Sequence, residues 1–298
     1  MKQKCNKKRI LRILGALLLL VLLILIACDT RLKIVHYTIE SDKITASVRI
    51  ALLTDLHSCN YGKNQKNLIE AVQKQNPDIV LLGGDIFDDK LPYDNAEIVV
   101  RQLAEQYPCY YVTGNHEYWS RDSGTILDIV KDCGVTALAG ECDTININGQ
   151  MLNICGVDDP DVEKYLVEGM PIEQQLKNAS KAAQDAVLAV EMQGTIDSEI
   201  FTILLSHRPE LFETYQNYDF DLIFSGHAHG GQWRIPGIMN GLYAPNQGLF
   251  PELAGGRYDF EDGTMIVSRG LARESTRVPR IFNRPELVII DIQNVSND

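Results

Sequence analysis

Short apolar runs that end beside polar side chains are the feature that most limits what this chain can fold into. Five such runs of four to six residues lie at 49–54, 79–82, 109–113, 201–206 and 222–225. Segments with helical spacing of apolar residues accompany the first three of them, at about 64–75, 95–106 and 123–133. Strands that alternate with helices in this way form sheets with a parallel core. The sequence therefore predicts an α/β fold.

The pattern changes after residue 135. Asn148-Gly149, the residue pair preferred in a type I′ turn, separates two short apolar segments and predicts a β-hairpin. Residues 158–195 are polar with helical spacing, which predicts a helical excursion within the same domain. A loop rich in Gly and Pro, at 230–256, leads to two last expected strands, at 265–268 and 286–292.

The first 33 residues differ in kind from the rest. They hold 8 of the 28 basic residues and 1 of the 40 acidic residues, and most of these cations precede an apolar run at 13–27. A helix that spans a membrane needs about 20 apolar residues. By the positive-inside rule the cationic flank stays in the cytoplasm and the remainder lies outside. We expect residues 1–33 to be a membrane anchor or a lipoprotein signal, and residues 34–298 to form the folded domain.

Two kinds of membrane attachment stay open. Leu25-Ile26-Ala27-Cys28 resembles a bacterial lipobox, in which the signal is cleaved before a cysteine that then carries lipid. The apolar length also suits the central region of such a signal. An uncleaved anchor and a lipoprotein attached through Cys28 both place the domain at the outer face of the cell membrane.

The charge of the domain limits its partners. Residues 34–298 hold 20 basic against 39 acidic residues. A domain this acidic repels polyanions, so we expect no nucleic-acid partner.

The cysteines do not indicate a disulfide framework. Five of them follow the apolar segment, an odd number without C-x-x-C spacing. We expect small buried side chains, with room for one bridge, at Cys59, Cys109, Cys133, Cys142 and Cys155.

Potential metal ligands gather where the strands are expected to end. They are Asp55, His57, Asp85, Asn115, His116, His207, His227 and His229. In open α/β sheets ligands bind at the carboxyl ends of strands. Carboxylate, amide and imidazole ligands without thiolate suit Mn, Fe, Zn or Mg. Because these ligands are too many for one ion, the sequence predicts two divalent metal ions about 3.5 to 4 Å apart, with Asp85 as the shared ligand.

Five short motifs in this order resemble the calcineurin-like metallophosphoesterase superfamily. They are D-x-H at 55–57, G-D-x-x-D at 84–88, G-N-H-[DE] at 114–117, H at His207 and G-H-x-H at 226–229. The continuation Gly230-Gly231-Gln232 and the tail at 280–286 resemble the membrane-anchored bacterial branch with the motif G-H-x-H-G-G-Q, although Ala272-Arg273-Glu274 fits that branch less well.

The resemblance implies a fold and a set of roles. The fold is a four-layer α/β/β/α sandwich of two mixed sheets flanked by helices. One ion would be held by Asp55, His57, Asp85 and His229, and the other by Asp85, Asn115, His207 and His227. His116 would face the phosphate as the catalytic residue, beside Asn115, with Asp88 or Glu117 orienting its surroundings. Weaker candidates for phosphate contact are Arg208, Arg273 and Arg277.

The implied activity is hydrolysis of a phosphodiester or phosphoanhydride bond by a hydroxide that bridges the two ions. The expected substrate is a phosphate ester. A lipid-linked ester is one candidate, because the anchor confines the site near the bilayer. The loop at 230–256 is expected to form a wall of the site that determines specificity. Two alternatives are a phosphomonoesterase and a non-catalytic binding or scaffold protein on the same fold. The scaffold alternative predicts missing ligands, and none is missing from the motifs.

Overall fold

The computed structural model describes residues 2–166, 169–192, 200–273 and 278–295. Its first sheet has six strands in the order β1-β14-β2-β3-β4-β5. These strands are β1 (Lys33–Glu40), β14 (Glu286–Gln293), β2 (Val48–Leu53), β3 (Ile79–Gly83), β4 (Cys109–Val112) and β5 (Thr136–Ala137). Strands β2 to β5 run parallel, whereas β14 pairs antiparallel with β2 and parallel with β1. The sheet is therefore mixed, with the expected parallel core.

The second sheet also has six strands, in the order β12-β13-β9-β8-β7-β6. They are β12 (Gly256–Phe260), β13 (Gly263–Val267), β9 (Leu222–Ser225), β8 (Phe201–Leu205), β7 (Gln150–Gly156) and β6 (Glu141–Ile147). The four central strands are parallel, and β12 and β6 pair antiparallel at the edges. In the turn between β6 and β7, Asn148 has φ 54° and Gly149 φ 90°, which confirms the predicted hairpin.

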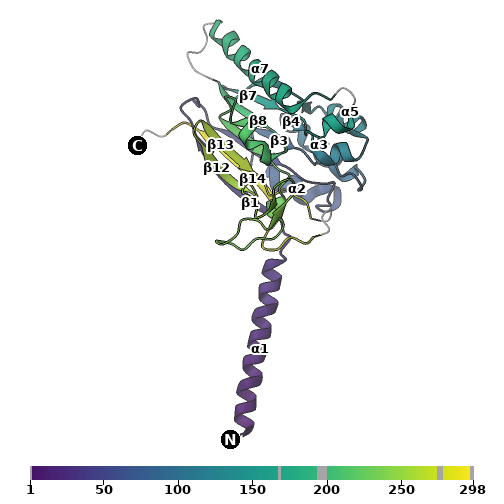
Figure 1. Ribbon diagram of the computed structural model, residues 1–298, viewed down its shortest axis with the longest axis vertical. Helices are drawn as coiled ribbons and strands as arrows, with labels where there is room; N and C mark the ends of the chain where they lie inside the picture. The colour runs from purple at the N-terminus through teal and green to yellow at the C-terminus, as the bar shows by residue number, and fades with distance from the viewer. Residues whose placement is uncertain (1, 167–168, 193–199, 274–277, 296–298) are drawn as a thin grey trace.

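Three apolar cores separate four layers. Helices α2 (Lys66–Gln73), α3 (Asp94–Ala104) and α5 (Ser123–Asp132) pack on the first sheet, where Val72, Val100 and Ile126 share a core with Leu82. A second core lies between the sheets, and a third joins the second sheet to α7 (Ile172–Met192). Figure 1 shows α3 and α5 beside one sheet and α7 beside the other. The expected four-layer α/β/β/α architecture is confirmed.

The remaining elements are short. They are α4 (Asn115–Trp119), α6 (Val162–Tyr165), α8 (Phe212–Tyr215), η1 (Lys63–Gln65), η2 (Pro209–Leu211), η3 (His229–Gly231), β10 (Tyr243–Ala244) and β11 (Gly248–Leu249). The helix expected over 64–75 starts only at Lys66, because Asn64 and Gln65 have φ of 52° and 56°, in the left-handed region that an α-helix excludes. The segment expected to be a loop at 230–256 contains η3 and the β10–β11 pair.

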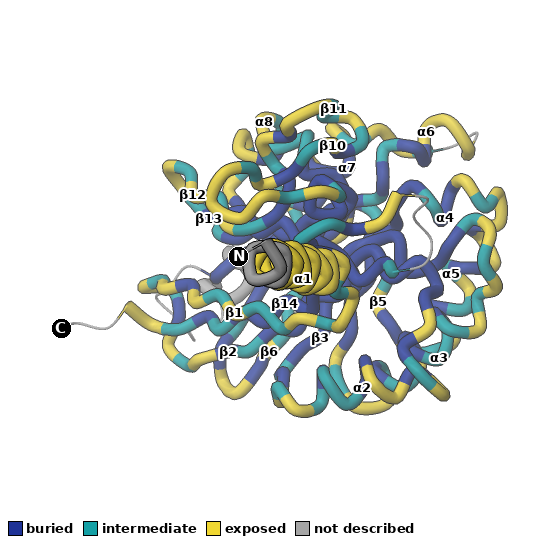
Figure 2. Tube along the Cα trace, turned by 90° about the horizontal axis from the view of Figure 1, so that it is seen from below, coloured by how far each residue is buried: buried dark blue, intermediate teal, exposed yellow. Residues whose placement is uncertain are grey.

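Helix α1 (Lys2–Ala27) projects from the body (Figure 1). Its 20 residues Lys8–Ala27 are long and apolar enough to cross a membrane, judged by length and composition. Figure 2 views it end-on and shows its exposed surface. At the end of the helix, the backbone N–H of Phe282 donates to the carbonyl of Ala27 at 2.7 Å.

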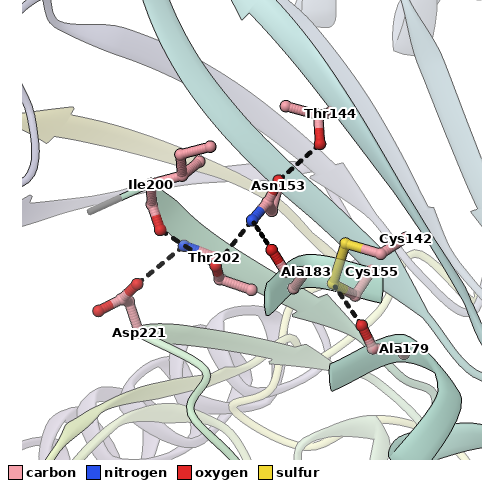
Figure 3. Close-up of a disulfide and its surroundings, with 9 residues drawn as sticks. All are labelled: Cys142, Thr144, Asn153, Cys155, Ala179, Ala183, Ile200, Thr202 and Asp221. Carbon is pink, nitrogen blue, oxygen red and sulfur yellow. Dashed lines mark hydrogen bonds between the residues drawn. A yellow bond between two sulfur atoms is a disulfide. The ribbon is translucent and has the colours of Figure 1, made fainter. Parts of the chain in front are cut away.

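One disulfide, Cys142–Cys155, joins β6 to β7 at directly opposed positions (Figure 3). The sulfur of Cys155 also lies 3.8 Å from the carbonyl oxygen of Ala179 on α7. Cys59 and Cys109 are buried, as expected of small apolar side chains. The bridge therefore reinforces one edge of the second sheet.

Candidate metal centre

The predicted ligands lie in loops that leave the carboxyl ends of parallel strands in both sheets. Asp55, His57, Asp85 and His229 each offer a ligand atom, and these four atoms lie within 4.8 Å of one another. Asp85, His207 and His227 form a second group with the same spacing. Asp85 is common to these two groups, and His57, Asp88 and His116 form a third. The structure thus brings together residues that span 174 positions of the chain.

The backbone at these loops is turned sharply. Five of the seven predicted ligands have φ near +50°: Asp55 (50°), His57 (48°), Asp85 (51°), His227 (62°) and His229 (47°). Residues other than glycine rarely adopt this left-handed region, and they do so where the surrounding structure holds them. The turns direct side chains from separate strand ends toward one point.

Two motif glycines make room for the ligands. A Cβ atom on Gly84, which has φ +84°, would lie 2.6 Å from Nδ1 of His207. A Cβ atom on Gly226 would lie 2.6 Å from Oδ2 of Asp55. Both distances are shorter than real Cβ contacts, so a larger residue at either position displaces a ligand.

Hydrogen bonds orient two of the histidines. Nδ1 of His207 lies 2.9 Å from the carbonyl oxygen of Gly83 and donates to it, so that Nε2, 3.2 Å from Oδ2 of Asp85, is the ring nitrogen that faces the cluster. Nδ1 of His57 lies 3.2 Å from Oδ2 of Asp88, and its Nε2 lies 3.5 Å from Oδ2 of Asp85. A hydrogen-bond partner at one ring nitrogen fixes the orientation of the imidazole and leaves the other nitrogen to bind a metal, as is usual around metal sites.

Several buried ligand atoms lack a hydrogen-bond partner within the described part of the chain. They are Asp55 Oδ2, His57 Nε2, Asp85 Oδ2, Asn115 Oδ1 and His207 Nε2. Leaving such an atom unsatisfied costs about 1 to 3 kcal/mol each, and more for charged groups. Oxygen and imidazole donors grouped in this way fit a divalent metal centre.

The two carboxylates at the centre differ in electrostatics. Burial raises the pKa of Asp55. Burial also acts to raise the pKa of Asp85, but the adjacent His207, His116 and His57 outweigh it and hold that pKa well below its usual value. Asp85 is therefore the carboxylate that stays charged between the two groups.

His116 lies at the edge of the cluster and is partly exposed, with its ring centroid 4.3 Å from that of His57. Its Nδ1 is 2.8 Å from Oδ1 of Asp89 and 3.5 Å from Oδ2 of Asp88. Burial lowers the pKa of His116, but Asp85, Asp88 and Asp89 more than offset it and raise the pKa to about 9. The ring is cationic at neutral pH in this setting.

The acids around His116 have separate tasks. Asp88, one expected partner of His116, also contacts His57. Glu117, the other, accepts hydrogen bonds from the backbone N–H groups of Asp85, Phe87 and Gly114 and so ties two motif loops together. Asp89 is nearest to His116 and was not singled out by the motif pattern. Its only signal in the sequence is its position directly after G-D-x-x-D.

Arg208 is buried beside the cluster. Its Nε and Nη2 donate to the carboxylate of Asp159, and its Nη1 lies 3.0 Å from Nε2 of His227. The sequence pointed to phosphate contact for Arg208, which stays a prediction, and it did not point to Asp159. Arg273 lies over the ring of Tyr61 and donates to the carbonyl of Asn60. Arg277 lies outside the described residues.

The tail after the last loop supports the final ligand. Nδ2 of Asn283 donates to the carbonyl oxygen of His229 at 2.7 Å, and the buried Arg280 places Nη2 3.5 Å from Nδ1 of the same histidine. The signal for these residues was the resemblance of the tail at 280–286, which carried no assigned role.

Comparisons with known proteins identify the family. The calcineurin-like phosphoesterase family matches residues 48–231. An uncharacterised metallophosphoesterase of Aquifex aeolicus is 28% identical and covers 89% of this chain and 94% of that protein. One from Helicobacter pylori is 30% identical over 68% of this chain and 50% of that protein. A Danio rerio transmembrane protein with a metallophosphoesterase domain is 26% identical over 67% of this chain and 45% of that protein.

The family match and the grouped metal ligands identify a metal-dependent hydrolase of phosphoesters. The chain belongs to the calcineurin-like phosphoesterase family.

Proposed function

We propose that this protein hydrolyses a phosphodiester or phosphoanhydride bond with two divalent metal ions, at the outer face of a membrane. The observation that carries the proposal is the position of Asp85, whose carboxylate belongs to two groups of ligand atoms, one with Asp55, His57 and His229 and one with His207 and His227. A shared carboxylate between two groups is the arrangement that a two-metal hydrolase needs.

The seven predicted ligands divide between two ions. Asp55, His57, Asp85 and His229 would hold one, and Asp85, Asn115, His207 and His227 the other. When bound, two such ions lower the pKa of water, so that it can attack phosphorus at neutral pH, and they offset the charge of the phosphate. Asp88 and Gly83 keep His57 and His207 in the orientation for binding.

His116 supplies the proton chemistry. Its ring is near His57, it is partly open to solvent, and Asp89 and Asp88 keep it protonated. In this state it stabilises negative charge on the phosphate and donates a proton to the leaving oxygen. In this proposal Asn115, the residue before His116, also contacts the substrate.

Fixed negative charge around the centre favours a diester over a monoester. Asp88, Asp89, Asp159 and Glu210 lie close to the histidines of the cluster or to Arg208 beside them. At neutral pH a diester carries one negative charge and a monoester close to two, so the monoester is repelled more strongly. This difference supports the diester as substrate class.

Two features support the location. The first residues of helix α1 are rich in cations and its remainder is an apolar segment of membrane length, which favours a cytoplasmic amino terminus. The Cys142–Cys155 disulfide is typical of an oxidising compartment outside the cytoplasm. The intact mass of the membrane-extracted protein separates the two kinds of anchor. A mass that corresponds to a chain beginning at a lipidated Cys28 would show that the protein is a lipoprotein and that α1 is cleaved off.

The activity is tested with the full-length protein in nanodiscs, loaded with Mn²⁺, on p-nitrophenyl phosphate and bis(p-nitrophenyl) phosphate. We expect a higher kcat/KM on the diester. Asp85→Asn should abolish turnover and lower metal content, whereas Asp128→Asn, the same change at an exposed site on α5, should alter neither.

Three results would count against the proposal. Preference for the monoester makes the protein a phosphomonoesterase. Metal binding without turnover of either ester favours the scaffold alternative. Full turnover by Asp85→Asn refutes the shared ligand.

A further inference from the structure

Apolar side chains are exposed together on the segment between η3 and β12. They are Trp233, Ile235, Ile238, Tyr243, Leu249 and Phe250, which we call the apolar loop surface. Ile238 is 83% exposed and Phe250 66% exposed. Soluble proteins rarely gather large apolar side chains on one surface unless that surface has a partner.

The charge of this segment differs from that of the body. Residues 230–251 contain one charged side chain, Arg234, and no acid, although residues 34–298 hold 39 acids. Anionic lipid repels this segment less than it repels the rest of the body, although Phe250 at its end lines a pocket with the acids Glu210, Glu213, Glu252 and Asp259. Trp and Tyr are also the residues enriched at the level of the lipid headgroups.

Hydrogen bonds fasten the apolar loop surface to the loop that carries His229. The N–H of Leu242 donates to the carbonyl of Gly231 at 2.9 Å, and the N–H of Phe250 donates to the carbonyl of Leu242 at 2.8 Å. Nε1 of Trp233 donates to the carbonyl of Pro279 at 3.0 Å. The surface is therefore held in place by the rest of the fold.

The same surface adjoins the end of α1. Trp233 forms an isolated β-bridge with Ile281, and the next residue, Phe282, donates its N–H to Ala27, the last residue of α1. In Figure 1 the green loops between η3 and β12 lie at the end of the body from which α1 projects. A helix that enters a membrane at Ala27 would bring these loops to the membrane surface.

We propose that the apolar loop surface lies in the interfacial layer of the bilayer that α1 enters, so that the body is docked on the lipid and not only tethered to it. Interfacial segments place their apolar side chains about 5 to 10 Å into the headgroup boundary. The inference rests on the membrane placement in the proposed function. Its consequence is that the wall of the metal centre formed by the loop after His229 faces the lipid.

The test uses the full-length chain in nanodiscs and the fluorescence of single tryptophans. The chain has two, Trp119 and Trp233. The Trp119→Phe variant leaves Trp233 as the only reporter. We expect its emission to shift to the blue and to be quenched by phosphatidylcholine brominated on the acyl chain near the carbonyl.

Two further variants supply a second reporter and a control. In a chain with Trp119→Phe and Trp233→Phe, Ile238→Trp places a reporter at the most exposed position of the surface, and we expect it to be quenched. In the same background Lys181→Trp places a reporter at an exposed position on α7. Helix α7 extends to the end of the body opposite α1 (Figure 1), so we expect no quenching there.

The proposal is overturned if Trp233 and Ile238→Trp keep their emission in brominated lipid while the chain is in the nanodisc. It is also overturned if Lys181→Trp is quenched equally. If each nanodisc holds two chains and Trp233 is not quenched, the apolar loop surface is instead a contact between two copies of the chain. Failure of the proposed function appears separately, as absent turnover of the soluble diester by the unaltered chain in detergent.

Discussion

Oδ1 of Asp55 accepts a hydrogen bond from the backbone N–H of His227 at 2.9 Å, although 172 residues separate the two. The loop that carries Asp55 therefore holds the loop that carries His227 in place, and both residues are predicted metal ligands. Asp55→Asn keeps an oxygen acceptor but loses the charge, and Asp55→Ala loses both.

We expect both Asp55 variants to lose metal, measured by elemental analysis. In the presence of a chelator only Asp55→Ala should unfold more easily, by about 1 to 3 kcal/mol, because it leaves a buried N–H without an acceptor. Equal unfolding temperatures of the two variants in chelator would show that the bond does not hold the loop.

His116→Gln tests proton donation. We expect kcat to fall by about 10² to 10⁴-fold, which is the usual contribution of general acid catalysis. The metal content of the variant should equal that of the unaltered protein. His36→Gln, the same change on the exposed edge strand β1, should leave kcat as it is. Loss of metal from His116→Gln would instead make this residue a ligand.

Asp89→Asn tests the orientation of His116. The variant keeps the size of the side chain but removes the charge 2.8 Å from Nδ1. Loss of such a supporting partner lowers activity by about 10 to 100-fold. We expect that loss in kcat, with KM and metal content unchanged. Asp94→Asn, at the exposed start of α3, is the matched control, and an equal effect of both variants would exclude a specific role.

Arg208→Met tests the buried ion pair. Asp159 is fully buried, and removal of its partner leaves an uncompensated charge that costs about 3 to 5 kcal/mol. We expect a lower unfolding temperature, partly restored when Asp159→Asn is added. An Arg208→Met chain with normal stability and a raised KM would show instead that Arg208 contacts the phosphate.

Asp158→Asn tests a pH dependence of stability. Burial raises the pKa of Asp158 to about 6, above the value of about 3.9 in an unfolded chain. The group therefore favours folding below pH 4, and this contribution is lost as the pH rises through 6. The loss corresponds to about 3 kcal/mol for two pKa units.

The amide in Asp158→Asn stays neutral and still accepts the hydrogen bond from Thr113. We expect the variant to be more stable than the unaltered protein at pH 8 and similar to it at pH 4, by thermal unfolding. Asp128→Asn should show no such difference. A constant gap across this pH range would contradict the raised pKa.

The sequence alone determined the central strands of both sheets, the parallel core and the loops that carry the predicted ligands. The strand at 79–82 and the position of Asp85 just after it could be predicted, because an apolar run that ends in polar residues is a pattern of neighbouring residues. The left-handed turns at Asn64 and Gln65, which shorten α2, were not readable, because neither residue requires that conformation.

Only the tertiary structure decided which side chains meet. Asp89 and not Asp88 is nearest to His116, Arg208 pairs with Asp159, and Phe282 fastens the end of α1 beside the apolar loop surface. Residue order does not encode these pairings, since partners 27 to 255 positions apart meet only when separate elements pack. Hydrophobic periodicity specifies which face of an element is buried, whereas the contacts of a polar side chain depend on where other elements come to lie.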